Sequence, residues 1–252
     1  MPNLPDSSDH PSTEDSDMTF RSDVTVELVR ASARDADVVF AARVSTVGES
    51  SVEDVDSDAQ RSAGLIRYLM RERHGSPFEH NSMTFLVQAP IFVWREHMRH
   101  RIASYNEESG RYRELRPIFY VPNETRSVVQ DGKPGAYEFH PGTPEQYDVI
   151  DSATRESCAV AYDAYKRMLD AGIAREVARM VLPVTIYSSA YVTMNARALM
   201  NFLSLRKKSD DATYPSYPQR EIEMVAEAYE EHFARLMPIT HEAFVASGRV
   251  AP

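Results

Sequence analysis

The hydrophobic pattern changes its period at Pro90, and this change constrains the fold more than any other feature of the sequence. Apolar residues alternate along residues 81–89, which is typical of a β-strand, and they place three side chains on one side: Met83, Phe85 and Val87. Residues 91–101 follow a helical period instead, and a helix tolerates proline in its first turn. The sequence therefore predicts that a strand passes directly into a helix.

The remaining pattern predicts an α+β fold that is rich in helices and forms one domain. Helices are expected over residues 35–45, 58–73, 143–172, 174–183 and 195–206, and a last long helix carries Ile222, Val225, Tyr229 and Leu236. Strands are expected near 24–29 and over 185–194, with a hairpin around Asp131–Gly132. Residues 1–20 are rich in Pro, Ser and Asp, so we expect a disordered acidic tail ahead of a domain spanning 21–252.

The charge balance restricts the possible partners. The chain of 252 residues has a formal net charge of −10, whereas proteins that bind nucleic acid or membrane surfaces usually present a basic face. The single cysteine, Cys158, excludes an internal disulfide and favours a reducing compartment. No signal peptide and no apolar run long enough to span a bilayer is recognisable, so we expect a cytoplasmic protein.

Positive charge is nevertheless concentrated in one stretch, RHRIASYNEESGRY at 99–112. Five arginines lie from Arg99 to Arg116, and nearby glutamates can neutralise only part of their charge. Guanidinium groups bind phosphate through paired hydrogen bonds, and Ser104, Asn106 and Ser109 add neutral donors. The residues alone support a site for a phosphorylated small molecule, and a solvated loop held by salt bridges remains the alternative.

Other chemistries have weaker support. Cys158 falls on the apolar stripe of a predicted helix, which favours a buried structural thiol over a nucleophile. The histidines at 74, 80, 97 and 100 match no zinc spacing, and the neighbouring arginines would repel a cation, so no metal is expected. The chain also lacks the glycine-rich signatures of nucleotide-binding loops.

The run at 99–112 matches the RHRxxSxxxxSxRY signature of flavin-dependent thymidylate synthases, and the chain resembles that family from about residue 24 to 245. Further shared blocks occur in the family's order: AARVS at 41–45, HGSPFEH at 74–80, APIFVWREHMRHR at 89–101, REVARMVLP at 175–183 and NARALMNFLSLR at 195–206. The resemblance implies a single domain in which a mixed sheet core is flanked by long helices. It also implies a homotetramer whose active sites are shared between subunits, with no nucleic-acid or membrane partner.

The resemblance implies the synthesis of dTMP from dUMP. In this family 5,10-methylenetetrahydrofolate supplies the carbon unit, NADPH supplies the reducing equivalents and FAD mediates the transfer. An arginine, here Arg206, is the catalytic residue, because it stabilises the ionised uracil ring. Such a route needs no cysteine nucleophile.

The family's site residues carry over onto matching positions of this chain. The flavin site is expected to use Ser45, His74, Ser76, Arg99, His100, Arg101, Glu107, Asn195, Arg197 and Asn201. The dUMP site is expected to use Glu96, His97, Met98, Arg99, Glu107, Glu108, Ser109, Gly110, Arg111, Arg179 and Arg206.

The chain departs from the family pattern at three places. Ser76 replaces a common threonine but keeps the hydroxyl, and Glu96 stands where some members have a glutamine that can donate a hydrogen bond. The insertion KKSDDATYPSYPQ follows Arg206 and leaves only Gln219 as a counterpart of the family's glutamine. Two other functions stay open: a non-catalytic nucleotide- or RNA-binding module, and a flavin-dependent methyltransferase acting on another pyrimidine.

Overall fold

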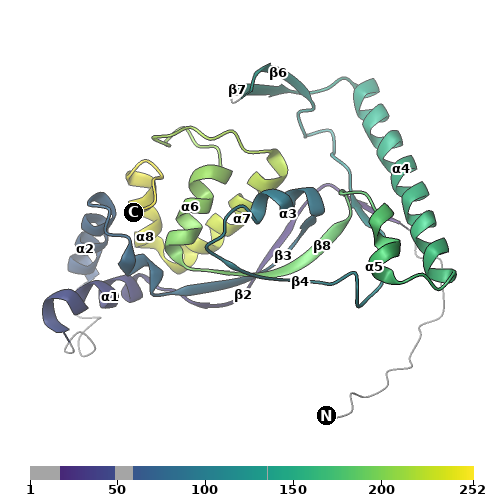
Figure 1. Ribbon diagram of the computed structural model, residues 1–252. Helices are drawn as coiled ribbons and strands as arrows, with labels where there is room; N and C mark the ends of the chain where they lie inside the picture. Colours follow the sequence, from purple (N-terminus) through teal and green to yellow (C-terminus); the bar gives the residue numbers. More distant parts are fainter. Residues whose placement is uncertain (1–17, 49–58, 135) are drawn as a thin grey trace, which may run out of the picture.

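The computed structural model describes residues 18–48, 59–134 and 136–252, and it confirms the α+β class (Figure 1). The predicted tail lies outside the described residues up to residue 17, as do residues 49–58. Thr19 and Phe20, which the sequence analysis assigned to the tail, instead belong to strand β1 (Thr19–Arg21). This strand pairs in parallel with β5 (Ile118–Tyr120), so the ordered domain begins slightly earlier than expected.

A four-stranded antiparallel sheet forms the centre of the molecule. Its strands lie in the order β2 (Thr25–Ser32), β3 (Ser82–Pro90), β8 (Tyr187–Met194) and β4 (Ser104–Glu107). The alternation predicted for β3 is confirmed, because Met83, Phe85 and Val87 are fully buried. Phe85 faces Val192 on β8, so both central strands contribute to one apolar core.

Three helices lie on one face of this sheet: α3 (Ile91–His97), α6 (Ala196–Arg206) and α7 (Arg220–Leu236) (Figure 1). Their inner faces bury Phe202, Tyr229 and Phe233. Further helices extend this core at one end of the sheet: α1 (Asp35–Val47), α2 (Ala59–Arg71) and α8 (Pro238–Ala246). The predicted apolar stripes of the helices near 58–73, 195–206 and 222–236 are therefore confirmed.

A second, smaller core lies at the other end of the sheet. The long helix α4 (Pro144–Asp170) begins at Thr143, whose side chain caps the helix together with Gln146. It buries Cys158 and Tyr165 against Phe119 and Ile186. A short helix, α5 (Arg175–Ala178), follows, and the hairpin of β6 (Val129–Lys133) and β7 (Ala136–His140) precedes α4.

The helix predicted over 91–101 is shorter than expected. It ends at His97, because the amides of Arg99 and His100 bond to carbonyls three residues back instead of four. Residues 104–107, for which the sequence analysis predicted no strand, form β4. Tertiary pairing explains this difference, since Ser104 to Glu107 pair with Thr193 to Ala190 of β8.

Two other elements differ in detail. The helix predicted over 174–183 divides into α5 and a 3-10 turn (Arg179–Val181), because Pro183 holds the preceding Leu182 in an extended conformation. The predicted hairpin is present, but Asp131 and Gly132 lie within β6 and face Glu138 and Tyr137. Within the three described segments, no helix is both long and apolar enough to cross a membrane.

Asp35 connects the first helix to the last, and its removal should destabilise the fold. Its carboxylate accepts hydrogen bonds from the amides of Ile239 and Thr240 (3.0 and 2.8 Å) and from the Thr240 hydroxyl (2.6 Å). Asp35→Ala leaves these partly buried donors unpaired and should lower the free energy of unfolding by about 1–3 kcal/mol. Urea denaturation measures this loss, and Asp163→Ala, which breaks an exposed ion pair with Arg167, should cost less than about 0.5 kcal/mol.

Candidate active site

Arg206 ends helix α6 and contacts two residues from the end of α3. Its Nη1 donates to Glu96 Oε2 at 3.0 Å, and its Nε donates to His100 Nε2 at 3.0 Å. All three side chains are half-buried, so water screens these contacts only partly. The Nη2 group of Arg206 bonds to no other described residue, which leaves donors for a ligand.

The protonation states of this cluster follow from its burial. Burial, aided by the nearby charge of Arg206, lowers the pKa of His100 to about 4, so the imidazole is neutral at pH 7 and its Nε2 can accept from Arg206. Burial also raises the pKa of Glu96, and the Arg206 charge opposes this effect. The guanidinium is therefore fixed by one carboxyl group and one neutral base.

The turn that carries Arg99, His100 and Arg101 is held by Tyr105 of β4. The Tyr105 hydroxyl donates to the carbonyls of His97 and His100 (3.2 and 2.9 Å) and lies 3.2 Å from His97 Nδ1. Burial lowers the pKa of His97 to about 3, so this ring is neutral. We infer that His97 Nδ1–H donates to Tyr105, and that the Tyr229 hydroxyl donates to His97 Nε2 at 2.9 Å.

The Arg99 and Arg101 side chains are exposed and have no ion-pair or hydrogen-bond partner among the residues that the structure describes. The glutamates that could neutralise them are engaged elsewhere, because Glu107 accepts from Ser188 at 2.5 Å and Glu114 pairs with Lys166 at 2.7 Å. The alternative of a salt-bridged loop therefore does not account for these two arginines. They remain available to an anion.

A second group of predicted residues lies where β4 leaves the sheet. The Glu108 carboxylate accepts a hydrogen bond from the backbone amide of Ser189 at 3.0 Å, and the backbone amide of Glu108 donates to the Ser189 carbonyl at 2.9 Å. Gly110 is buried against Arg179, whose Cδ would lie 3.2 Å from a Cβ added at this glycine. Arg111 pairs with Glu176 of α5 at 2.8 Å. The loop 108–111, which follows β4, is thereby fixed beside Arg179.

A third group surrounds the amino-terminal end of α6. Asn195 caps the helix by accepting from the amide of Ala198 at 2.9 Å. Arg197 donates from Nη1 to Glu79 at 2.5 Å, and the Asn201 amide donates to the Arg197 carbonyl at 3.1 Å. Glu79 lies in the short 3-10 helix Ser76–Glu79, which follows His74 in the chain.

The predicted residues thus fall into separate groups within one chain. Arg197 and Arg206 lie about 14 Å apart along the axis of α6, given a rise of about 1.5 Å per residue. Ser45 lies apart from these contacts on α1, where its hydroxyl donates to the Ala42 carbonyl. The exposed Met98 follows the last residue of α3. No three His, Cys, Asp or Glu side chains of the described residues are arranged to hold a metal.

Sequence reasoning missed the residues that hold the predicted ones in place. Tyr105 occupies a variable position of the signature, Ser188 lies inside a strand pattern, and Glu176 and Glu79 come from other segments. Each contact joins residues that are distant in sequence, except that of Tyr105. Only Tyr105 could have been proposed from the sequence as a supporting residue, because it lies close to the arginines in the chain.

Removal of the Tyr105 hydroxyl should loosen the turn at 97–101. Tyr105→Phe leaves the His97 and His100 carbonyls without this donor, so the free energy of unfolding should fall by about 1–3 kcal/mol. Hydrogen exchange should also quicken at the amides of residues 98–100. Tyr112→Phe, at a side chain that is 80% exposed, serves as the control. Equal exchange rates in the two variants would show that the phenol does not hold the turn.

The chain resembles known proteins over nearly its whole length. A family model described as "Thymidylate synthase complementing protein" matches residues 27–239. The flavin-dependent thymidylate synthase of Streptomyces coelicolor is 62% identical over 240 residues, which cover 95% of this chain and 98% of that protein. The enzyme of the same name from Tropheryma whipplei is 60% identical over 236 residues, covering 94% and 98%.

Solved structures agree with these relatives. The UMP/dUMP methylase PolB from Streptomyces cacaoi, bound with 5-Br dUMP, superposes with a TM-score of 0.89 at 58% identity and covers 93% of this chain and 100% of that one. Its complex with 5-Br UMP gives a TM-score of 0.86 at 56% identity. Sequence and fold therefore agree that this chain is an enzyme of the flavin-dependent thymidylate synthase family.

Proposed function

We propose that the enzyme methylates dUMP to dTMP, with 5,10-methylenetetrahydrofolate as the carbon donor, FAD as the redox cofactor and NADPH as the reductant. The position of Arg206 carries this proposal. Its guanidinium is held by Glu96 and by a neutral His100, and its Nη2 group remains available to a ligand. A positive charge fixed in this way can stabilise a uracil ring that has lost its N3 proton, and the ionised ring is more nucleophilic at C5.

The residues at both ends of α6 fit FAD. Arg99, Arg101 and Arg197 offer guanidinium donors suited to phosphate groups. His74 and Ser76 are exposed on either side of Gly75, which lies against the Arg197 guanidinium. When bound, FAD supplies the redox chemistry that brings the transferred carbon to the methyl level. The chain binds and orients the reactants, and Arg206 stabilises negative charge on the pyrimidine.

The location of Cys158 supports a route without a cysteine nucleophile. This only cysteine of the chain is 1% exposed in the second core, and its Sγ lies 3.5 Å from the Thr185 hydroxyl. A thiol in such a place cannot reach C6 of a nucleotide held by Arg206. Ring activation therefore falls to Arg206 in our proposal.

The separation of the site residues supports an oligomer with shared active sites, as expected for a homotetramer. Arg111 and Arg179 lie beside α5, away from Arg206, and exposed apolar side chains flank them: Tyr112, Val177, Met180, Val181 and Val184. Large exposed apolar patches often mark protein interfaces. A second copy that covers this surface would bring its own groups to Arg111 and Arg179 and complete a dUMP site.

Replacement of Arg206 tests the proposal. Arg206→Ala should reduce dTMP formation about 10²- to 10³-fold, because it removes the charge opposite the ionised ring, and it should leave FAD bound. Chromatographic measurement of dTMP and the flavin absorbance spectrum report the two properties separately.

Two control variants accompany this experiment. Arg167→Ala removes an exposed guanidinium paired with Asp163, and Cys158→Ala removes the thiol; both should retain turnover near that of the wild type. Normal turnover by Arg206→Ala would contradict the catalytic role of this residue. Loss of turnover in Cys158→Ala, with the fold intact, would instead point to a thiol-dependent route.

A second candidate substrate is UMP, because the similar PolB is named a UMP/dUMP methylase and was solved with analogues of both nucleotides. We expect dUMP to be preferred here by about 10- to 100-fold in kcat/KM, since the 2′-hydroxyl of UMP would have to be accommodated at the cost of one unpaired polar group. Competition between the two nucleotides, with dTMP and 5-methyl-UMP quantified by chromatography, measures this ratio. Equal rates would assign the chain the broader activity of PolB.

A non-catalytic RNA-binding function makes different predictions. Such a protein would be colourless and would bind oligonucleotides with a steep dependence on salt. Flavin absorbance that changes when dUMP is added argues for the enzyme.

A further inference from the structure

The last six residues of the sequence, 247–252, follow helix α8 and lie along α6; we call this segment the C-terminal strap. It lies beyond the region that matches the family model, which ends at residue 239. Most of its length is at least partly buried, and it contacts both ends of α6. These two ends carry the predicted flavin residues and the proposed catalytic arginine.

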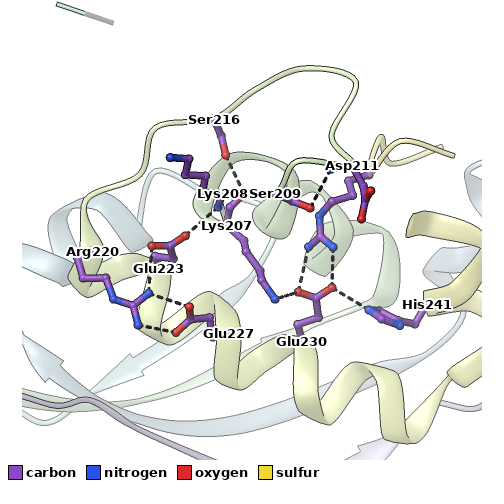
Figure 2. A network of polar contacts seen from close by, with 11 residues as sticks. Lys207, Lys208, Ser209, Asp211, Ser216, Arg220, Glu223, Glu227, Glu230 and His241 are labelled. Atoms are coloured by element: carbon purple, nitrogen blue, oxygen red, sulfur yellow. Dashed lines mark hydrogen bonds and ion pairs between the residues drawn. The ribbon is translucent and has the colours of Figure 1, made fainter. Parts of the chain in front are cut away.

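Arg249 anchors the strap to α7. Its side chain is 5% exposed, and its two Nη atoms donate to the two carboxylate oxygens of Glu230 at 2.8 and 3.0 Å. Glu230 also accepts from Lys207 at 2.6 Å and from His241 at 2.8 Å, and Figure 2 shows these two side chains converging on it. The carboxylate thus joins the strap to α8 and to the residue that follows Arg206.

The Glu230 carboxylate of this buried network pairs with two cationic side chains, whereas Arg249 Nε has no hydrogen-bond partner among the described residues. Burial acts to raise the pKa of the Glu230 carboxyl, but the hydrogen bonds from its three cationic or imidazole partners outweigh that effect and hold the pKa well below its usual range. Loss of one partner from a buried ionic network is costly, which keeps Arg249 in place.

The strap also holds the insertion at 207–219. Gly248 adopts a left-handed backbone conformation (φ +67°), and a Cβ there would lie 1.9 Å from Thr213 Oγ1. The Thr213 amide donates to the Gly248 carbonyl at 2.9 Å, and the Ser204 hydroxyl donates to the Arg249 carbonyl at 2.6 Å. The strap therefore begins beside the last turn of α6.

The other end of the strap reaches the predicted flavin residues. The Arg73 Nη1 donates to the Ala251 carbonyl at 2.7 Å, and the Arg197 Nε donates to the Pro252 carbonyl oxygen at 2.6 Å. Gly75 permits this approach, because a Cβ there would lie 2.8 Å from the same Pro252 oxygen. Between Ser204 and Arg197 the strap spans about 10 Å of α6.

We propose that the C-terminal strap is a positioning element for FAD, an inference that rests on the proposed function. Pro252 accepts a hydrogen bond from Arg197 Nε, and Glu79 accepts one from Arg197 Nη1. These two bonds fix the plane of the guanidinium, while its Nη2 group bonds to no described residue and stays available to a ligand. Arg73 and Gly75 contact the same strap, and they are the chain neighbours of the predicted flavin residues His74 and Ser76. The strap holds these groups in place before FAD binds. FAD binding therefore loses less conformational entropy in ordering them.

Removal of residues 251 and 252, with residues 1–250 unchanged, tests this inference. The variant lacking Ala251 and Pro252 retains Arg249 and its buried network, but it loses both carbonyl acceptors. The FAD concentration that gives half-maximal dTMP formation should rise about 10-fold, and kcat at saturating FAD should stay within about twofold of the wild type. A strap that serves folding alone would instead lower the melting temperature and kcat without changing FAD half-saturation.

Single substitutions that keep the full chain provide the second measurement. Arg73→Ala removes one bond to the strap and should raise the Kd for FAD about threefold, and Arg73→Lys, which keeps a donor, should restore most of the affinity. Arg67→Ala is the matched control, because Arg67 lies on α2 and pairs with the exposed Glu242. FAD fluorescence quenching measures each Kd.

The outcomes separate the inference from the function on which it rests. If the shortened variant and Arg73→Ala bind FAD as tightly as the wild type, the strap has no positioning role, and the proposed function stands. A wild-type protein that binds no FAD would overturn both.

Discussion

The antiparallel pairing of β3 with β8 determines where the candidate active site forms. Pro90 faces Tyr187 at one end of this pair and Met83 faces Met194 at the other. Helix α3 follows β3 directly, and α6 follows β8 after Asn195, so the two helices start from opposite ends of the sheet. Both turn back over the same face and run toward each other.

The lengths of these elements bring the two helices together. Eight paired residues span about 26 Å of strand, and helices of 7 and 11 residues extend about 10 and 16 Å. Their carboxyl-terminal ends therefore meet above the sheet, which is where Glu96 and His100 contact Arg206. Trp94 fixes α3 in this position, because its Nε1 donates to the Ala89 carbonyl at 3.0 Å.

Local sequence pattern is sufficient to predict the two strand–helix junctions, but it does not predict the long-range contacts between them. The period change at Pro90 and the cap at Asn195 predict strand–helix junctions, since both depend on neighbouring residues. The resemblance to a known family adds the identity of Arg206. The contact of Arg206 with His100 joins residues 106 positions apart, and β4 exists because β8 offers it an edge. Such features depend on register and helix length, which no short window of sequence contains.

The meeting of α3 and α6 has an electrostatic consequence. Each helix directs the partial negative charge of its terminal carbonyl groups toward the same place, where Arg206 and the turn with Arg99 and Arg101 lie. Backbone dipoles can therefore offset part of the mutual repulsion of these guanidinium groups, of which only Arg206 is paired with a carboxylate of the described residues, that of Glu96. An acidic protein can keep a concentrated positive centre in this way. Since no carboxylate of the described residues pairs with Arg99 or Arg101, an arriving anion displaces none of them when it binds there.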